Sequence, residues 1–103
     1  MEEKRDTLLK LGFNVNSIGF DYWLYAIKLY NQYRGKYVFS METLYKDIAK
    51  YFKTTRNRAE RAMRTASIHA KENIKKIYKY NNKITNKTIL ILLTRFDEQK
   101  QEF

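Results

Sequence analysis

One stretch of the sequence gathers arginine side chains at helical spacing. Arg58, Arg61 and Arg64 recur every third residue, and Thr65 follows the last of them. An α-helix has about 3.6 residues per turn, so it would place these four side chains on one side. An arginine can donate two hydrogen bonds to O6 and N7 of guanine, and an α-helix fits the major groove of B-form DNA. The pattern therefore predicts a helix that reads base edges of duplex DNA.

An acidic residue, Glu60, lies within the same stretch. A surface that only attracts polyanions gains little from a carboxylate, whereas a base-reading helix can use it to accept a hydrogen bond from N4 of cytosine. Glu60 also precedes Arg64 by one helical turn, and such an ion pair stabilises a helix by about 0.2–0.5 kcal/mol. Both roles are compatible, because the ion pair can hold the arginine in one rotamer.

Basic and polar side chains around a base-reading helix are expected to contact DNA phosphates, which gives affinity without sequence information. Seven residues have suitable side chains and places in the sequence, namely Lys50, Lys53, Thr55, Arg56, Asn57, Lys75 and Lys76. The chain has a formal net charge of +10, and residues 41–83, with twelve basic and four acidic side chains, carry +8 of it. A positive patch of this kind attracts polyanions through counterion release.

The composition argues against other kinds of chemistry. The 103 residues fit one domain, and 44% of them are hydrophobic, which is enough for a core. The chain has no cysteine and one histidine, His69, so thiol catalysis and the usual zinc sites have too few ligands. Tyr22 and Tyr25 lie at core spacing and are poor candidates for a nucleophile. We expect a non-enzymatic protein with no catalytic residue, cofactor, metal site or small-molecule substrate.

No segment of the sequence has the features of a membrane span or a signal peptide. The longest apolar run, Ile89–Leu93, is far too short to cross a bilayer. The first residues are charged and lack the apolar stretch of a secretory signal. We therefore expect no membrane partner and a cytoplasmic, DNA-associated location.

About five to six helices must position the basic residues. Acidic residues in the first turn and Gly12 at the end predict a helix over residues 2–11. Apolar spacing predicts a second helix over residues 20–34, which ends at Gly35 and whose apolar face is interpreted as part of the core. Tryptophan and phenylalanine side chains make the second of them the bulkiest apolar face in the chain.

After these two helices, the sequence predicts a helix-turn-helix. Ser40 is a typical N-cap for a helix that ends near Phe52, and Thr54 or Thr55 can cap a second helix over about residues 56–72. The second helix would carry the arginines on its outer face. Its inner face would consist mostly of small residues, namely Ala59, Ala62, Met63, Ala66 and Ala70.

Two structures remain open for the region after Asn73. Residues 77–83 and 87–93 suit a β-hairpin wing with a turn at residues 81–82, whose tip would approach an AT-rich minor groove. Alternatively, Thr85 and Asn86 cap a final helix through Arg95, which we favour slightly. The expected fold is a mainly α helix-turn-helix domain over residues 1–96, with the wing as an alternative and a polar tail at 97–103.

The helix pair resembles a known bacterial family. The stretch 44–55, followed by 58–66, is similar to the C-terminal DNA-binding domain of the master sporulation response regulator of bacilli and clostridia, with a looser match over roughly residues 8–95. The resemblance implies a helical effector domain that binds AT-flanked tandem boxes as a head-to-tail homodimer. It implies base-reading roles for Glu60, Arg61, Arg64 and Thr65, and it adds Lys83 from the later loop.

The departures from this family leave the biological role open. Thr65 stands where the family usually has histidine, so the preferred box is expected to differ. Lys71 replaces a tryptophan, and this change leaves room for a wing after the second helix. We expect a stand-alone regulator without a receiver domain. The chain is also similar to small helix-turn-helix proteins of clostridial plasmids, including accessory proteins of conjugation that mark a transfer origin. RNA binding is a third and weaker hypothesis, since the aromatic residues lie at core spacing.

Overall fold

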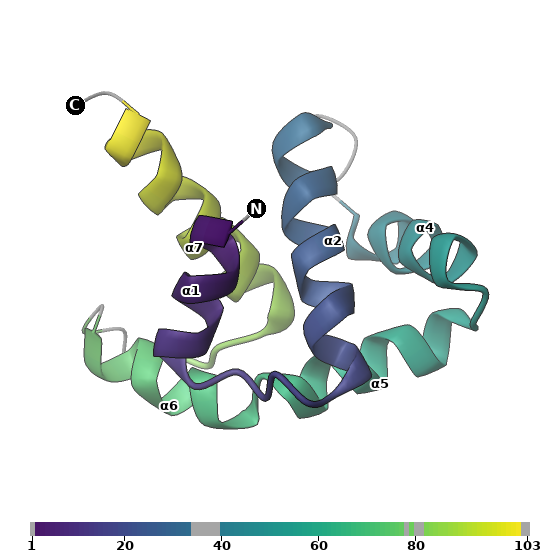
Figure 1. The fold of residues 1–103 in the computed structure, drawn as a ribbon, viewed down its shortest axis with the longest axis horizontal. Coiled ribbons are helices and arrows are strands. Elements are labelled where there is room, and N and C mark those ends of the chain that lie inside the picture. Colours follow the sequence, from purple (N-terminus) through teal and green to yellow (C-terminus); the bar gives the residue numbers. More distant parts are fainter. Residues whose placement is uncertain (1, 34–39, 78, 80–81, 102–103) are drawn as a thin grey trace.

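The computed structural model describes residues 2–33, 40–77, 79 and 82–101, and the secondary structure of these residues is helical (Figure 1). Along the chain the helices are α1 (Glu2–Leu11), α2 (Ile18–Gln32), α4 (Met41–Phe52), α5 (Arg56–Ala66), α6 (Ile68–Ile77) and α7 (Asn86–Gln101). The described residues contain no strand. The predicted class, a mainly α domain of five to six helices, is therefore confirmed.

Helix α2 is the central element of the fold. It packs against α4, α5 and α7, which surround it in Figure 1. It begins at Ile18, two residues earlier than predicted, and ends at Gln32, while Gly35 lies outside the described residues. Phe20 and Trp23 are completely buried and form the middle of the core. Because α2 contacts three other helices, it fixes their mutual arrangement.

Helix α5 lies unusually close to the first turn of α2. A Cβ atom at Gly19 would collide with the backbone carbonyl of Ala62 and lie 2.9 Å from the Ala66 Cβ. Only a glycine at position 19 lets the two backbones come this close together. Small residues on the inner face of α5 serve the same purpose, because Ala59 and Ala66 are buried against the core.

The predicted helix over residues 56–72 is wrong in one respect, because it is interrupted at Ser67. Ser67 Oγ donates to the Arg64 carbonyl at 3.0 Å, and the Ser67 N–H lies 3.2 Å from the Met63 carbonyl. The Ala66 carbonyl accepts instead from the N–H of Asn14 at 3.3 Å. A buried serine that bonds to nearby carbonyls competes with the regular helix ladder. Helix α5 therefore ends at Ala66, and α6 begins at Ile68.

Helix α6 is tied to the end of α1. Asn73 Nδ2 donates to the Leu11 carbonyl at 2.7 Å, and Gly12 has a φ of 95°, which ends α1 in a left-handed conformation. Ala70 and Ile74 are buried on the same side of α6. His69 is exposed.

The C-terminal region is a helix and not a wing. Residues 87–93, proposed as one strand of the hairpin, lie within α7. Ile89, Leu90 and Leu93 are buried at the spacing of one helix face, and α2 covers that face. Thr85 Oγ1 accepts from the Thr88 N–H at 3.2 Å, which confirms the predicted cap. The helix continues to Gln101, beyond the predicted end at Arg95, and residue 81 of the predicted turn lies outside the described residues.

Candidate nucleic-acid interface

The turn between α4 and α5 is defined by local hydrogen bonds. Ser40 Oγ accepts from the Thr43 N–H at 3.3 Å and begins α4 as predicted. Lys53 ends α4 in a left-handed conformation with φ 56°, and the Thr54 N–H donates to the Ala49 carbonyl at 2.9 Å. Thr55 then caps α5, since its Oγ1 accepts from the Arg58 N–H at 3.2 Å. Helices α4 and α5 are therefore joined by a turn of three residues.

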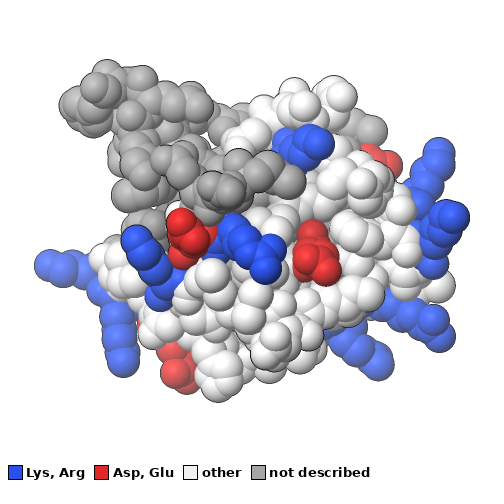
Figure 2. Space-filling view, viewed as in Figure 1, with Lys and Arg blue, Asp and Glu red and all other residues white. Residues whose placement is uncertain are grey.

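The predicted base-reading residues of α5 lie together on its exposed side. At about 100° per residue, the exposed side chains occupy one continuous arc of the helix, centred on Arg61. That arc consists of Asn57, Arg58, Arg61, Arg64 and Thr65, all of which are exposed. Figure 2 shows Lys and Arg side chains projecting at the lower left and lower right of the molecule, toward the α6 and α5 sides of Figure 1. The arc is the largest arginine cluster of the described residues.

Arg56, predicted as a phosphate contact, instead connects α4 with α5. Its Nε donates to Glu42 Oε2 at 2.9 Å, and its guanidinium forms ion pairs with both Glu42 and Glu60. The guanidinium also lies over the ring of Tyr45, 5.1 Å from the centroid. The hydrogen bond from Arg56 holds the pKa of Glu42 below its ordinary value. The position of α5 on α4 therefore depends partly on this arginine.

Glu60 lies at one edge of the arc, between two arginines. Its side chain is 27% exposed, and its Oε1 lies 3.9 Å from NH2 of Arg64, so the ion pair suggested by the sequence is present. Its other ion pair is with Arg56, one turn earlier. Glu60 therefore restrains Arg64 while it keeps part of its carboxylate accessible.

The remaining predicted phosphate residues fall into two groups. Lys50, Lys53, Thr55 and Asn57 surround the turn and the start of α5, and all four are exposed. Lys75 and Lys76 are exposed in the last turn of α6, at the end remote from α5 in Figure 1. The structure thus brings the first group together with the arginine arc, and it leaves the two α6 lysines apart from it.

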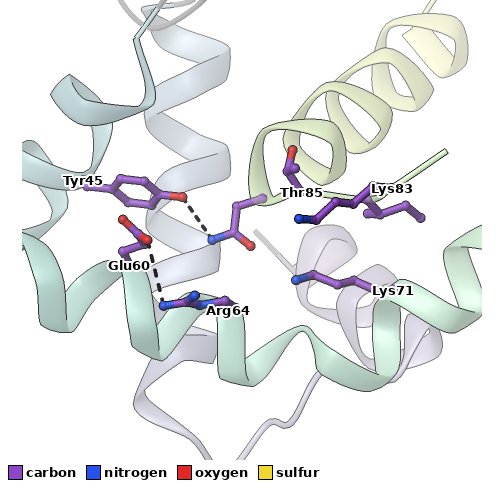
Figure 3. A pocket seen from close by; sticks show the side chains of 8 residues that line it. Tyr45, Glu60, Arg64, Lys71, Lys83 and Thr85 are labelled. Atoms are coloured by element: carbon purple, nitrogen blue, oxygen red, sulfur yellow. Dashed lines mark hydrogen bonds and ion pairs between the residues drawn. The ribbon is translucent and has the colours of Figure 1, made fainter.

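A pocket lies beside the arc, and the sequence analysis missed most of it. Its lining joins α4, α5, α6 and the start of α7, and comprises Tyr45, Glu60, Arg64, Lys71, Lys83, Ile84, Thr85 and Asn86 (Figure 3). Lys83, predicted from the family resemblance, therefore lies near Arg64. Lys71 follows Arg64 by seven residues, which is two turns of the single helix predicted over residues 56–72. That spacing was the sequence signal that Lys71 would lie on the same side as Arg64.

These features together define a class of protein. The described residues form helices only, expose an arginine-rich helix face, and contain no cluster of acidic, histidine or cysteine residues able to hold a metal ion. None of the described helices combines the length and apolar character needed to cross a bilayer. A small helical domain with a basic, exposed helix face is typical of DNA-binding domains.

The family model described as "Sporulation initiation factor Spo0A C terminal" matches residues 5–95. The chain belongs to this family, and the predicted resemblance is confirmed. Members of the family are DNA-binding regulatory domains, so DNA is the partner of this fold. Neither the curated proteins nor the solved structures compared with the chain gave a match.

Proposed function

We propose that the chain binds duplex DNA sequence-specifically, with α4 and α5 as a helix-turn-helix and α5 in the major groove. The arc centred on Arg61 is the observation that carries this proposal. The opposite side of α5 contacts the core through main-chain atoms at Ala62 and Met63, so the helix is held firmly. A firmly held helix presents its arginines at a fixed spacing, as recognition of successive base edges requires.

Each basic or polar residue of the interface has a proposed role. Base edges are read by Arg58, Glu60, Arg61, Arg64 and Thr65, with Lys83 contributing from the loop before α7. Phosphates are held by Lys50, Lys53, Thr55 and Asn57, which surround the turn. Lys75 and Lys76 add longer-range attraction from the end of α6. The ion pairs of Arg56 favour a positioning role for it, because its guanidinium already contacts Glu42 and Glu60.

Glu60 is well placed to take part in base recognition. Its carboxylate accepts from Arg56 on one side and lies 3.9 Å from Arg64 on the other. The two arginines offset the cost of placing a carboxylate near DNA phosphates. The accessible part of the carboxylate can accept a hydrogen bond from N4 of cytosine. This arrangement predicts a preference for cytosine at the position that Glu60 faces.

We further propose that the protein acts as a non-catalytic regulator that binds AT-rich tandem boxes as a homodimer. A plasmid accessory protein that marks a transfer origin would need the same interface. The distribution of binding sites distinguishes these two roles, because a regulator binds upstream of genes and an accessory protein binds a cluster at the origin.

Selection of bound duplexes from a randomised DNA pool, at near-physiological salt, tests the proposal. We expect an enriched motif for the natural chain and for the control variant Lys28→Gln, in which an exposed lysine of α2 is neutralised. Arg61→Ala is expected to lose preference at one position of that motif. Absence of any enriched motif, with binding that disappears as salt rises, would show a surface for polyanions only.

A further inference from the structure

The pocket between α5, α6 and the start of α7 has features of an anion-binding site. Three cationic side chains, Arg64, Lys71 and Lys83, line it together with one acidic residue, Glu60 (Figure 3). The carboxylate of Glu60 is already paired with Arg56 and Arg64. Lys71 and Lys83 therefore face the pocket without a comparable acidic partner among its lining residues.

The polar atom that most clearly lacks a partner in this pocket belongs to Asn86. Asn86 is 8% exposed, and its Nδ2 donates to the Tyr45 hydroxyl at 3.0 Å. Its Oδ1 is buried and has no hydrogen-bond partner. A buried acceptor without a donor is costly, and native proteins rarely leave one in that state. The charged donors that the pocket lining offers are the ammonium groups of its lysines and the guanidinium of Arg64.

The cationic side chains that line the pocket repel one another. Burial lowers the pKa of Lys71, and the positive charges of Arg64 and Lys83 lower it further. An anion held between these cations would offset their repulsion. One ammonium group could then approach Oδ1 of Asn86 while it still contacts the anion.

The start of α7 adds a third contribution. Thr85 Oγ1 and the Thr85 carbonyl accept from the N–H groups of Thr88 and Ile89, at 3.2 and 3.1 Å. The earlier N–H groups of Asn86 and Lys87 have no acceptor within the helix, as at every helix N-terminus. Such groups and the helix dipole favour negative charge, above all phosphate.

We propose that this pocket binds a phosphate group, held by Lys71, Lys83 and the first turn of α7, with Arg64 at its rim. Two sources have the same chemistry, namely a phosphate of the duplex backbone and a free phosphate-bearing small molecule. If the source is the duplex, the proposal rests on the proposed function, and Lys83 contacts a phosphate instead of a base. A duplex phosphate in the pocket would fix the register of α5 on its site.

Titration of inorganic phosphate into the full chain at constant ionic strength tests the site directly. We expect saturable shifts of the backbone amide NMR signals of residues 85–88. Lys71→Gln should weaken phosphate binding about tenfold, as loss of one charge-assisted hydrogen bond predicts. Lys83→Gln should have a similar effect, and Lys28→Gln should bind phosphate like the natural chain. Shifts that do not saturate, or that persist unchanged in Lys71→Gln, would overturn the proposal.

A second titration, with duplex DNA carrying the selected motif and phosphate already bound, separates the two sources. Displacement of phosphate from residues 85–88 would identify the duplex backbone as its source. Binding of the duplex with phosphate still in the pocket would identify a free phosphate-bearing molecule. A chain that binds phosphate but no duplex would refute the proposed function and leave the pocket proposal standing.

Discussion

The indole Nε1 of Trp23 donates a 2.8 Å hydrogen bond to the backbone carbonyl of Met63. Trp23 is completely buried in α2, and Met63 lies in the last turn of α5. The same carbonyl also accepts from the Ser67 N–H at 3.2 Å, so the indole N–H is its second donor. This bond fixes the end of α5 to the core, and with it the direction of the arginine arc.

Trp23→Phe should therefore disturb both stability and DNA binding. The substitution removes the donor to Met63 and leaves a small cavity, so we expect the free energy of unfolding to fall by about 1–3 kcal/mol. Urea unfolding measures this loss. Phe20→Leu is the matched control, because it removes volume from the same core without breaking this hydrogen bond. If the duplex affinity of folded Trp23→Phe equals that of folded Phe20→Leu, the bond does not orient α5.

Gly19→Ala should force α2 and α5 apart. The added methyl group would collide with the Ala62 carbonyl, which is backbone and cannot turn away. Overpacking of this kind typically destabilises a protein by about 1–3 kcal/mol. Thermal unfolding measures the loss, and Ile18→Ala, at an exposed neighbour, provides the comparison. A stability equal to that of the natural chain would mean that the helices are not in backbone contact.

Arg56→Gln should make stability less dependent on pH in the acidic range. Arg56 holds the pKa of Glu42 below its ordinary value of about 4.3. A carboxylate whose pKa is lower in the folded state stabilises the fold above its unfolded pKa, and this contribution disappears as pH falls through the folded pKa. The melting temperatures of the natural chain and Arg56→Gln should therefore differ at pH 7 and converge toward pH 3. Arg58→Gln, which removes the same charge from the exposed arc, should show no such convergence.

Arg61→Ala should weaken binding to the selected duplex by about 1–3 kcal/mol. Arg61 lies at the centre of the exposed arc and has no buried contact to lose, so folding should be unaffected. Fluorescence anisotropy with the selected duplex and single-base variants of it measures the change. Specificity should relax at one base position only. An equal loss on every duplex would assign Arg61 to phosphate.

Lys53→Asn should weaken binding to all duplexes alike. Asparagine tolerates the left-handed conformation that Lys53 adopts, so this change removes the charge without straining the turn. The dependence of log affinity on log salt concentration should decrease by about one unit. Titrations at several salt concentrations give this slope. A loss confined to the selected motif would indicate a base contact at Lys53.

The sequence was sufficient to predict the elements that local signals define. Ser40 and Thr55 are strong N-caps, and both begin the helices that they were expected to begin. The interruption at Ser67 was missed because no glycine or proline marks it. The alanine spacing continues through Ala66 and Ala70 as if one helix were present. The end of α5 depends on tertiary contacts, including the hydrogen bond from the Asn14 N–H to Ala66.

Only the part of the candidate site that local patterns define was predictable from the sequence. The arc of α5 follows from periodicity within eleven residues, which the sequence displays directly. The partner of Arg56 is Glu42, fourteen residues earlier, and the partner of Asn86 is Tyr45, forty-one residues earlier. Contacts at such separations depend on how the helices cross, and no local pattern encodes that crossing.

The arrangement of α5 has a consequence for how this family can diversify. On its inner side the backbone of α5 contacts the backbone of α2, and at Gly19 there is no space even for a methyl group. Its outer side carries exposed residues, and substitutions there have little cost in folding; under the proposed function they change recognition. The two sides of one eleven-residue helix are thus under separate constraints. New binding specificities can arise on the outer side while the scaffold stays unchanged.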